Sequence, residues 1–306
     1  MSGFVEALHA APAMLADGGI ETGLIYQYGL DLPDFASFLP LFDAAGRDAI
    51  EALYRSYFDV AAQSGLAMQI GTPTWRAHPD GLRRQGLAAH DDLRRVNAEA
   101  VALLAEMRHA TGLHDRVFIA GVIGPRRDGY DPRGAPRAAE ARDYHAAQAD
   151  VLAGLGVDLL YAPTFASVEE LLGVAQAMAA TGLPYVVAPV LDPHGRLPDG
   201  TTLDAAVARV DAGTTRPPLH YMIGCVHPTH FPASAPHHRV AGLKANASTL
   251  PPDQLDRLDH LDAGAPELFA EQMLALRRDY GLKMLGGCCG TDARHIGAIA
   301  RRLSAA

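Results

Sequence analysis

Short apolar runs alternate with longer amphipathic segments along this 306-residue chain, and no other feature limits its fold as strongly. The runs are almost continuous in apolar residues, which is typical of parallel strands buried on both faces of a sheet. They cover Ala13–Ala16, Leu66–Thr72, Val117–Val122, Asp158–Ala162, Tyr185–Val190, His220–Gly224, Val240–Ala245 and Lys283–Gly286. The sequence therefore predicts eight strands in one parallel sheet.

The segments between these strands have the apolar period of helices. The clearest is Arg47–Gln63, where apolar residues recur close to every 3.6 positions. The other predicted helices are Leu87–His109, Ala138–Leu155, Val168–Ala180, Leu203–Asp211, Pro266–Tyr280 and Ala293–Leu303. No helical pattern lies between Gly224 and Val240, and only a weak one between Pro251 and Leu261. We therefore expect irregular units after the sixth and seventh strands.

Strands that alternate with helices from end to end predict one α/β domain over residues 1–306, folded as a (β/α)8 TIM barrel. A doubly wound open sheet is the alternative, because periodicity alone does not separate the two folds. In a barrel the active site forms at the carboxyl ends of the strands. Polar and sulfur-containing residues end five of the predicted strands, which favours the closed sheet. They are Asp17, Thr72, Cys225, Asn246 and the pair Cys288–Cys289.

The three cysteines of the chain predict a metal site. Cys225 ends the sixth strand, and Cys288 and Cys289 follow the eighth in the glycine-containing run Gly286–Thr291. Glycine lets the backbone bring neighbouring side chains onto one ion. Three thiolates leave the fourth position of a tetrahedral Zn²⁺ site open, which is the arrangement of a catalytic zinc. Buried, unreactive thiols are the alternative.

Composition excludes several classes of partner and location. The formal net charge is −9, from 26 basic and 35 acidic residues, which disfavours nucleic acid and anionic membranes as partners. The chain shows no basic segment leading into an apolar core at its start and no run of about 18 apolar residues, so we expect neither a signal peptide nor a membrane span. Few cysteines in an odd number indicate free thiols in the cytoplasm. Nothing in the sequence indicates an oligomeric state.

With these motifs the chain resembles the homocysteine S-methyltransferase family. This zinc-dependent group includes betaine–homocysteine and S-methylmethionine–homocysteine methyltransferases and the homocysteine module of methionine synthase. The most specific match is the cysteine run after the eighth strand, with Cys225 as the upstream cysteine. Weaker matches follow in order between residues 14 and about 303: Asp17–Thr22, Thr72–Trp75, Gly121–Pro125 and Asp199–Thr201.

The resemblance implies methyl transfer to a thiol. Cys225, Cys288 and Cys289 would hold Zn²⁺, and a small-molecule thiol, above all L-homocysteine, would be its fourth ligand and would yield methionine. Coordination to zinc deprotonates a thiol. The donor would be a sulfonium or quaternary ammonium compound such as S-methylmethionine, S-adenosylmethionine or betaine.

The resemblance also implies substrate-binding residues at the strand ends. Asp17 would face the ammonium group of the amino acid, and the backbone N–H groups of Gly18 and Gly19 would face its carboxylate. Glu21 belongs to the same loop. Trp75 would lie near the mouth, where its ring face could hold a cationic donor; packing between barrel and helix is the alternative for this single tryptophan. The remaining candidates are Thr72 and Asn246.

Three positions depart from the family's pattern. Pro163 stands where members usually carry a glutamate that holds the substrate's ammonium group, and Pro73 and Gly224 each replace an asparagine. Arg76 follows Trp75 and would suit a donor or acceptor with a carboxylate. We therefore expect the zinc chemistry of the family with an altered amino-acid pocket.

Two other functions stay open at this point. A barrel enzyme could use the same zinc on another thiol or in a different reaction, such as a lyase or hydrolase reaction. A non-catalytic redox or metal sensor could use the adjacent pair Cys288–Cys289. Loop histidines could add metal ligands, although such histidines are usually only solvated; they are His227, His230, His237 and His238.

Overall fold

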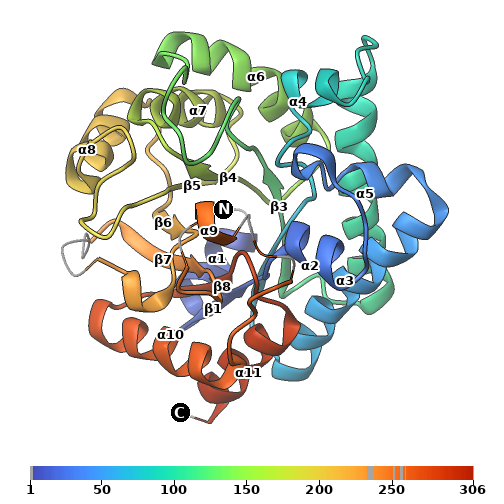
Figure 1. Cartoon of the computed structure of the whole chain (residues 1–306), viewed down its shortest axis with the longest axis vertical. Coiled ribbons are helices and arrows are strands. Elements are labelled where there is room, and N and C mark those ends of the chain that lie inside the picture. Colours follow the sequence, from blue (N-terminus) through green and yellow to red (C-terminus); the bar gives the residue numbers. More distant parts are fainter. Residues whose placement is uncertain (1–2, 233–237, 251, 256–257, 259, 306) are drawn as a thin grey trace.

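A closed sheet of eight parallel strands forms the centre of the molecule in the computed structural model, which describes residues 3–232, 238–250, 252–255, 258 and 260–305. The strands follow one another around the barrel in chain order, and β1 pairs with β8 to close it. Helices surround the sheet (Figure 1). The strands are β1 (Met14–Ala16), β2 (Met68–Gly71), β3 (Val117–Val122), β4 (Leu159–Phe165), β5 (Tyr185–Pro189), β6 (Tyr221–Gly224), β7 (Val240–Ala245) and β8 (Met284–Gly287).

Helices lie in most of the connections between strands. After the first five strands come α2 (Ile20–Tyr26), α3 (Ala44–Ser64), α4 (Pro79–Arg84), α5 (Asp92–Thr111), α6 (Ala138–Gly154), α7 (Val168–Ala180) and α8 (Leu203–Gly213). After the last two come α9 (Pro252–Leu255), α10 (Pro266–Tyr280) and α11 (Ala293–Ser304). Short 3-10 helices are η1 (Pro33–Phe35), η2 (Leu39–Phe42) and η3 (Pro228–His230). In the part of the chain that the structure describes, no helix is both long and apolar enough to cross a membrane.

Helix α3 shows how the sequence produces an outer helix. It begins where the Asp43 carboxylate accepts a hydrogen bond from the backbone N–H of Gly46 (2.8 Å), which stabilises a helix start. Its apolar stripe, which includes Ile50 and Tyr54, is buried against the barrel. The Tyr54 hydroxyl donates a hydrogen bond to the carbonyl of Gly71 (2.8 Å) and so fixes the helix against the end of β2.

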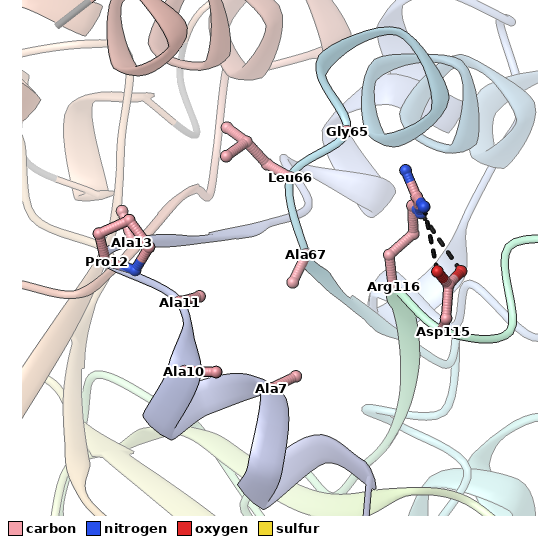
Figure 2. Close-up of a pocket in the computed structure, with 10 residues that line it drawn as sticks. All are labelled: Ala7, Ala10, Ala11, Pro12, Ala13, Gly65, Leu66, Ala67, Asp115 and Arg116. Carbon is pink, nitrogen blue, oxygen red and sulfur yellow. Dashed lines mark hydrogen bonds and ion pairs between the residues drawn. The ribbon is translucent and has the colours of Figure 1, made fainter.

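Helix α1 (Gly3–Ala10) closes the barrel at the amino ends of the strands. Its Phe4 is fully buried and packs edge-on against Phe118 of β3, with 5.6 Å between the ring centroids. Beside α1 lies a shallow pocket of about 350 Å³, lined by α1 and the segments before β2 and β3, among them the ion pair of Asp115 with Arg116 (Figure 2). This end is opposite to the carboxyl ends of the strands.

The predicted (β/α)8 barrel is confirmed, and the closed sheet excludes the open alternative. Each predicted strand is present. The irregular units are also found: in the described residues between β6 and β7 the only helix is η3, and after β7 the short α9 precedes α10. Three helices of eight residues or fewer, α1, α2 and α4, were missed because they are too short to show a period.

Several predicted boundaries differ from the structure by a few residues, and two of the differences have local reasons. The helix predicted over Leu87–His109 begins only at Asp92, because the Asp92 carboxylate accepts the backbone N–H of Ala89 (2.9 Å) and holds a turn there. Strand β4 continues past the predicted end to Phe165. It does so through a register shift at Pro163, since a proline without an N–H is tolerated at a bulge.

The contact between α6 and α7 gives a test of this packing. A Cβ on Gly173 of α7 would lie 2.3 Å from the Cβ of Ala141 and 2.6 Å from the carbonyl oxygen of Ala138. We expect Gly173→Ala to lower the free energy of unfolding by about 1–3 kcal/mol, measured by urea denaturation. The control is Gly154→Ala, where the added methyl meets no atom within 4 Å and stability should hold or rise. Equal stability of the two variants would contradict the close approach of these helices.

Candidate metal centre

Three cysteine sulfurs meet at the carboxyl ends of β6 and β8. The Sγ atoms of Cys225 and Cys288 are 2.8 Å apart, and all three Sγ atoms, with that of Cys289, lie within 4.8 Å of one another. Among the described residues, this is the one cluster of histidine, cysteine or acidic side chains that could hold a metal ion. Free thiols in this number and spacing fit a tetrahedral Zn²⁺ with one position left open.

Strand register explains why the sulfurs meet. Gly224 of β6 pairs with Lys244 of β7, which in turn pairs with Gly286 of β8, so the three strands end at the same level. Cys225 directly follows this row. The backbone N–H of Cys288 donates to the carbonyl of Ala245 (2.7 Å), which brings the second cysteine loop to the same height.

Cys225 has a left-handed backbone conformation, with φ of 56°. Such a conformation costs a residue other than glycine about 1–3 kcal/mol and persists only where the surroundings hold it. Here the Asn246 side chain donates a hydrogen bond to the Cys225 carbonyl (3.0 Å), and the Cys225 N–H donates to the carbonyl of Lys244 (3.1 Å). Strand β7 thus aims the Cys225 sulfur at the other two.

The turn that carries Cys288 and Cys289 is held by the loop after β1. Gly290 makes the turn with φ of 79°, and the Thr291 hydroxyl donates to the Cys288 carbonyl (2.7 Å). The N–H of Gly19 donates to the Thr291 carbonyl (3.1 Å). A Cβ on Gly19 would lie 2.6 Å from the Cys288 carbonyl oxygen, so only glycine permits this approach.

Neighbouring side chains act on the Cys225 sulfur. Hydrogen bonds from the thiols of Cys288 and then Cys289 hold the pKa of Cys225 well below its usual range, and the hydroxyl groups of Tyr130 and Thr164 add to the effect. The Thr164 Oγ1 atom lies 3.9 Å from the Cys225 sulfur. The same cluster raises the pKa of Cys288 and Cys289, so the negative charge of the three sulfurs is concentrated on Cys225.

A cavity of about 650 Å³ opens above the sulfurs. Every candidate residue from the sequence lines it: Asp17, Gly18, Gly19, Glu21, Thr72, Trp75, Cys225, Asn246, Cys288 and Cys289. Its aromatic lining residues are Tyr26, Phe35, Trp75, Tyr130 and Tyr161, and its further acidic residues are Asp31, Asp34, Asp128 and Asp262. An acidic and aromatic lining favours a cationic ligand.

Asp17 already has a cationic partner within the chain. Its Oδ1 atom pairs with the Lys244 ammonium group, and its Oδ2 atom accepts the N–H of Gly71 (2.7 Å). The Asp17 carboxylate is buried, and the Lys244 side chain is only 13% exposed. Burial acts to lower the pKa of Lys244, but the Asp17 charge outweighs it and the pKa is raised. The carboxylate that the resemblance assigned to a substrate ammonium group is thus neutralised by Lys244.

Glu21 and Thr72 make contacts of different kinds. Glu21 accepts a hydrogen bond from the Ser37 hydroxyl (2.8 Å), and burial raises the pKa of its carboxyl group. Thr72 contacts the Thr74 hydroxyl (2.6 Å) and accepts the N–H of Val122 (3.0 Å), so it ties β2 to β3.

The buried Arg76 stacks on the half-buried Trp75. The Arg76 guanidinium group lies 4.0 Å from the centroid of the Trp75 ring, and burial lowers the pKa of Arg76. Its Nη1 atom donates to the carbonyls of Pro125 (3.1 Å) and Arg127 (2.6 Å), so it holds the loop after β3. One face of Trp75 is therefore covered by Arg76, and only the rest of the ring is left for a donor.

Lys244, Tyr130 and Tyr161 are among the cavity residues that were not predicted. Lys244 carried a usable signal, because it is a charged residue inside an otherwise apolar strand and stands two positions before Asn246, on the same side of β7. Tyr161 is an ordinary strand residue by sequence, and Tyr130 lies in a long loop. The histidines His227, His230 and His238 lie outside the sulfur cluster, and His237 lies outside the described residues.

Comparison with known proteins decides the family. The model of the homocysteine S-methyltransferase family matches residues 14–303. The chain belongs to the homocysteine S-methyltransferase family. It is 26% identical to betaine–homocysteine S-methyltransferase 1 of Danio rerio, over 99% of this chain and 76% of that protein. It is 25% identical to methionine synthase of Mycobacterium tuberculosis (strain ATCC 25618 / H37Rv), over 94% of this chain and 24% of that protein.

Solved structures of another protein have the same fold as this chain. The metallated form of the homocysteine methyltransferase MmuM from Escherichia coli superposes with a TM-score of 0.78 at 21% identity, over 98% of this chain and 99% of that one. Its oxidized form gives a TM-score of 0.80 at 20% identity, over 99% and 100% of the two chains. At 20–21% sequence identity, this similarity establishes the barrel fold but does not show which ligands the barrel binds.

Loss of one sulfur tests the metal site. We expect wild-type protein, purified under reducing conditions, to bind about one Zn²⁺ per chain, and Cys288→Ala to weaken binding by at least about 100-fold, because a ligand is removed outright. Mass spectrometry of bound metal and competition with a chelator measure both. The control is His227→Ala, which changes a nearby loop residue outside the cluster and should keep the metal. Full zinc occupancy in Cys288→Ala would contradict the assignment.

Asp292 caps α11 directly after the cysteine turn and gives a pH-dependent test. Burial acts to raise its pKa, but contacts with His295 and Arg294 outweigh it and hold the pKa well below 3.8. A carboxyl group with a lowered pKa stabilises the fold above its unfolded-state pKa, and that stability is lost as the pH falls through the folded-state pKa.

We therefore expect Asp292→Asn to lower the free energy of unfolding by about 1–2 kcal/mol at pH 7. The deficit should be constant above about pH 5 and should shrink below pH 4, because the wild-type carboxyl then loses its advantage. Urea denaturation of both proteins between pH 3 and pH 8 measures it. A deficit that grows on acidification would contradict this role of Asp292.

Proposed function

We propose that the protein is a zinc-dependent S-methyltransferase that moves a methyl group from a cationic donor to L-homocysteine, yielding methionine. The observation that carries this proposal is the cluster of three free thiols beneath a cavity, with donor atoms suited to Zn²⁺. The metallated form of MmuM, a homocysteine methyltransferase, supports a metal in this fold. Free thiols at a reactive site also support the cytoplasm as its location.

The cysteines Cys225, Cys288 and Cys289 would hold the ion. When bound, Zn²⁺ lowers the pKa of an acceptor thiol, so that this thiol reacts as a thiolate at neutral pH. In the transfer, a bond forms between the acceptor sulfur and the methyl carbon while the bond from that carbon to the donor's positive sulfur or nitrogen breaks. The donor leaves as a neutral sulfide or amine, and the acceptor's proton goes to solvent.

The cavity lining supports a cationic donor. Its acidic residues outnumber the basic side chains Lys244 and Arg76, both of which have anionic or carbonyl partners within the chain. Aromatic rings such as Tyr26 and Phe35 add faces that attract a sulfonium or quaternary ammonium group. S-Methylmethionine, S-adenosylmethionine and betaine all have this character.

One observation favours a second candidate, methyl transfer to a thiol other than homocysteine. Asp17 is neutralised by Lys244, and Pro163 provides no carboxylate at the end of β4. An α-ammonium group would therefore meet fewer free charges than the resemblance implies.

Product detection across donors and acceptors tests the proposal. Zinc-loaded protein is incubated with S-methylmethionine, S-adenosylmethionine, betaine or dimethylsulfoniopropionate, each with L-homocysteine and with other small thiols, and mass spectrometry detects the S-methylated product. We expect turnover with at least one pair, and a loss of at least about 1,000-fold in Cys288→Ala, because thiol activation depends on the bound ion. A zinc-loaded protein that methylates no thiol from any donor would contradict the proposal.

A further inference from the structure

We propose that Lys244 and the hydroxyl group of Tyr161 form a carboxylate-binding site beside the three sulfurs, so that the acceptor thiol must carry a carboxylate. This inference rests on the proposed methyl transfer to a thiol. It identifies the side chains, one from β4 and one from β7, that bind the carboxylate of the acceptor.

Lys244 places a positive charge in the cavity next to the sulfur cluster. Its ammonium group has three N–H donors, and Asp17 is the acceptor it has among the described residues. Since Lys244 lines the cavity, the remaining donors are available to a ligand there. Lys244 pairs with Gly224, which directly precedes Cys225, and with Gly286, two residues before Cys288, so it lies beside both cysteine loops. A carboxylate is the acceptor that pairs best with such a group.

Tyr161 supplies an independent observation. Its side chain is 2% exposed and lines the same cavity, and its hydroxyl has no hydrogen-bond partner in the part of the chain that the structure describes. The charges of Cys288, Cys225 and Asp17 all act on this hydroxyl, so it lies within electrostatic reach of the sulfurs and of Asp17. A buried hydroxyl without a partner is unfavourable, and a ligand oxygen would supply the missing acceptor.

The pairing with Asp17 makes Lys244 a fixed binding group. Asp17 is itself held by the N–H of Gly71 (2.7 Å), so the ammonium group is positioned before a ligand arrives. A group that is already in place loses little conformational freedom when it binds. Because Asp17 is neutralised in this way, removing the acceptor's ammonium group should matter less than removing its carboxylate.

Three related thiols separate the contribution of the acceptor's carboxylate to binding from that of its ammonium group in the wild-type protein. L-Homocysteine carries both groups, 4-mercaptobutanoate lacks the ammonium group, and 3-mercaptopropylamine lacks the carboxylate. Calorimetric titration of the zinc-loaded protein gives a Kd for each, and kcat/KM follows where a donor supports turnover. We expect 3-mercaptopropylamine to bind at least about tenfold more weakly than L-homocysteine. We expect 4-mercaptobutanoate to lose less affinity than 3-mercaptopropylamine does.

Substitutions assign the effect to the two side chains. In Lys244→Met, the preference for L-homocysteine over 3-mercaptopropylamine should fall to about threefold, because the charge is gone and only the Tyr161 hydroxyl still binds the carboxylate. Tyr161→Phe should reduce the discrimination by about three- to tenfold. The matched control is Lys283→Met, the only other lysine, which lies at the opposite end of β8 and donates to the carbonyl of His9. This control should keep the wild-type discrimination.

Failure of this inference differs from failure of the proposed function. If no thiol binds the zinc-loaded wild-type protein, the methyltransferase proposal fails. If the thiols bind but 3-mercaptopropylamine equals L-homocysteine, the carboxylate site is overturned, and unchanged discrimination in Lys244→Met would overturn it equally. Zinc content and melting temperature are measured for every variant; should Lys244→Met not fold, the wild-type series and Tyr161→Phe decide.

Discussion

The pairing of β1 with β8 closes the sheet, and the contacts of the candidate site depend on it. Closure places the loop after β1 against the cysteine turn after β8, where Gly19 and Thr291 share a backbone hydrogen bond. It also brings Asp17 to Lys244, its partner 227 positions along the chain. In an open sheet these strands would lie at opposite edges. The closed barrel thus provides both the sulfur cluster and the charged pair beside it.

The site is also where the chain departs from ordinary local preferences. Cys225 and Thr164 both have positive φ, an uncommon conformation for residues other than glycine or asparagine, and their side chains contact each other (3.9 Å). Asn246 stabilises the first of them through the Cys225 carbonyl. Strain of this kind persists where surrounding contacts hold it, and here those contacts come from Lys244 of β7 and from Asn246, directly after that strand. The same contacts orient the metal-binding sulfur.

Some features of this molecule leave a local signal in the sequence, and others do not. Strands buried on both faces leave uninterrupted apolar runs, and residues at their carboxyl ends converge whatever the helices do, so the barrel and the cysteine cluster could be predicted. The Asp17–Lys244 pair could not, because nothing local in either segment indicates a partner so far away. Nor could the stacking of Arg76 on Trp75, because arginine beside tryptophan is equally compatible with a solvent-exposed guanidinium group.

The charges of the cavity fit a reaction that removes charge. Transfer of a methyl group from a cation to a thiolate ends in two neutral products, so a site that solvates separated charges poorly favours the transition state over the reactants. Two of the carboxylates here are paired within the chain, Asp17 with Lys244 and Asp34 with Arg84. The groups left for the acceptor are the thiols, the spare donors of Lys244 and the hydroxyl of Tyr161. Such a cavity can hold an acceptor by its carboxylate without strongly solvating the thiolate that must react.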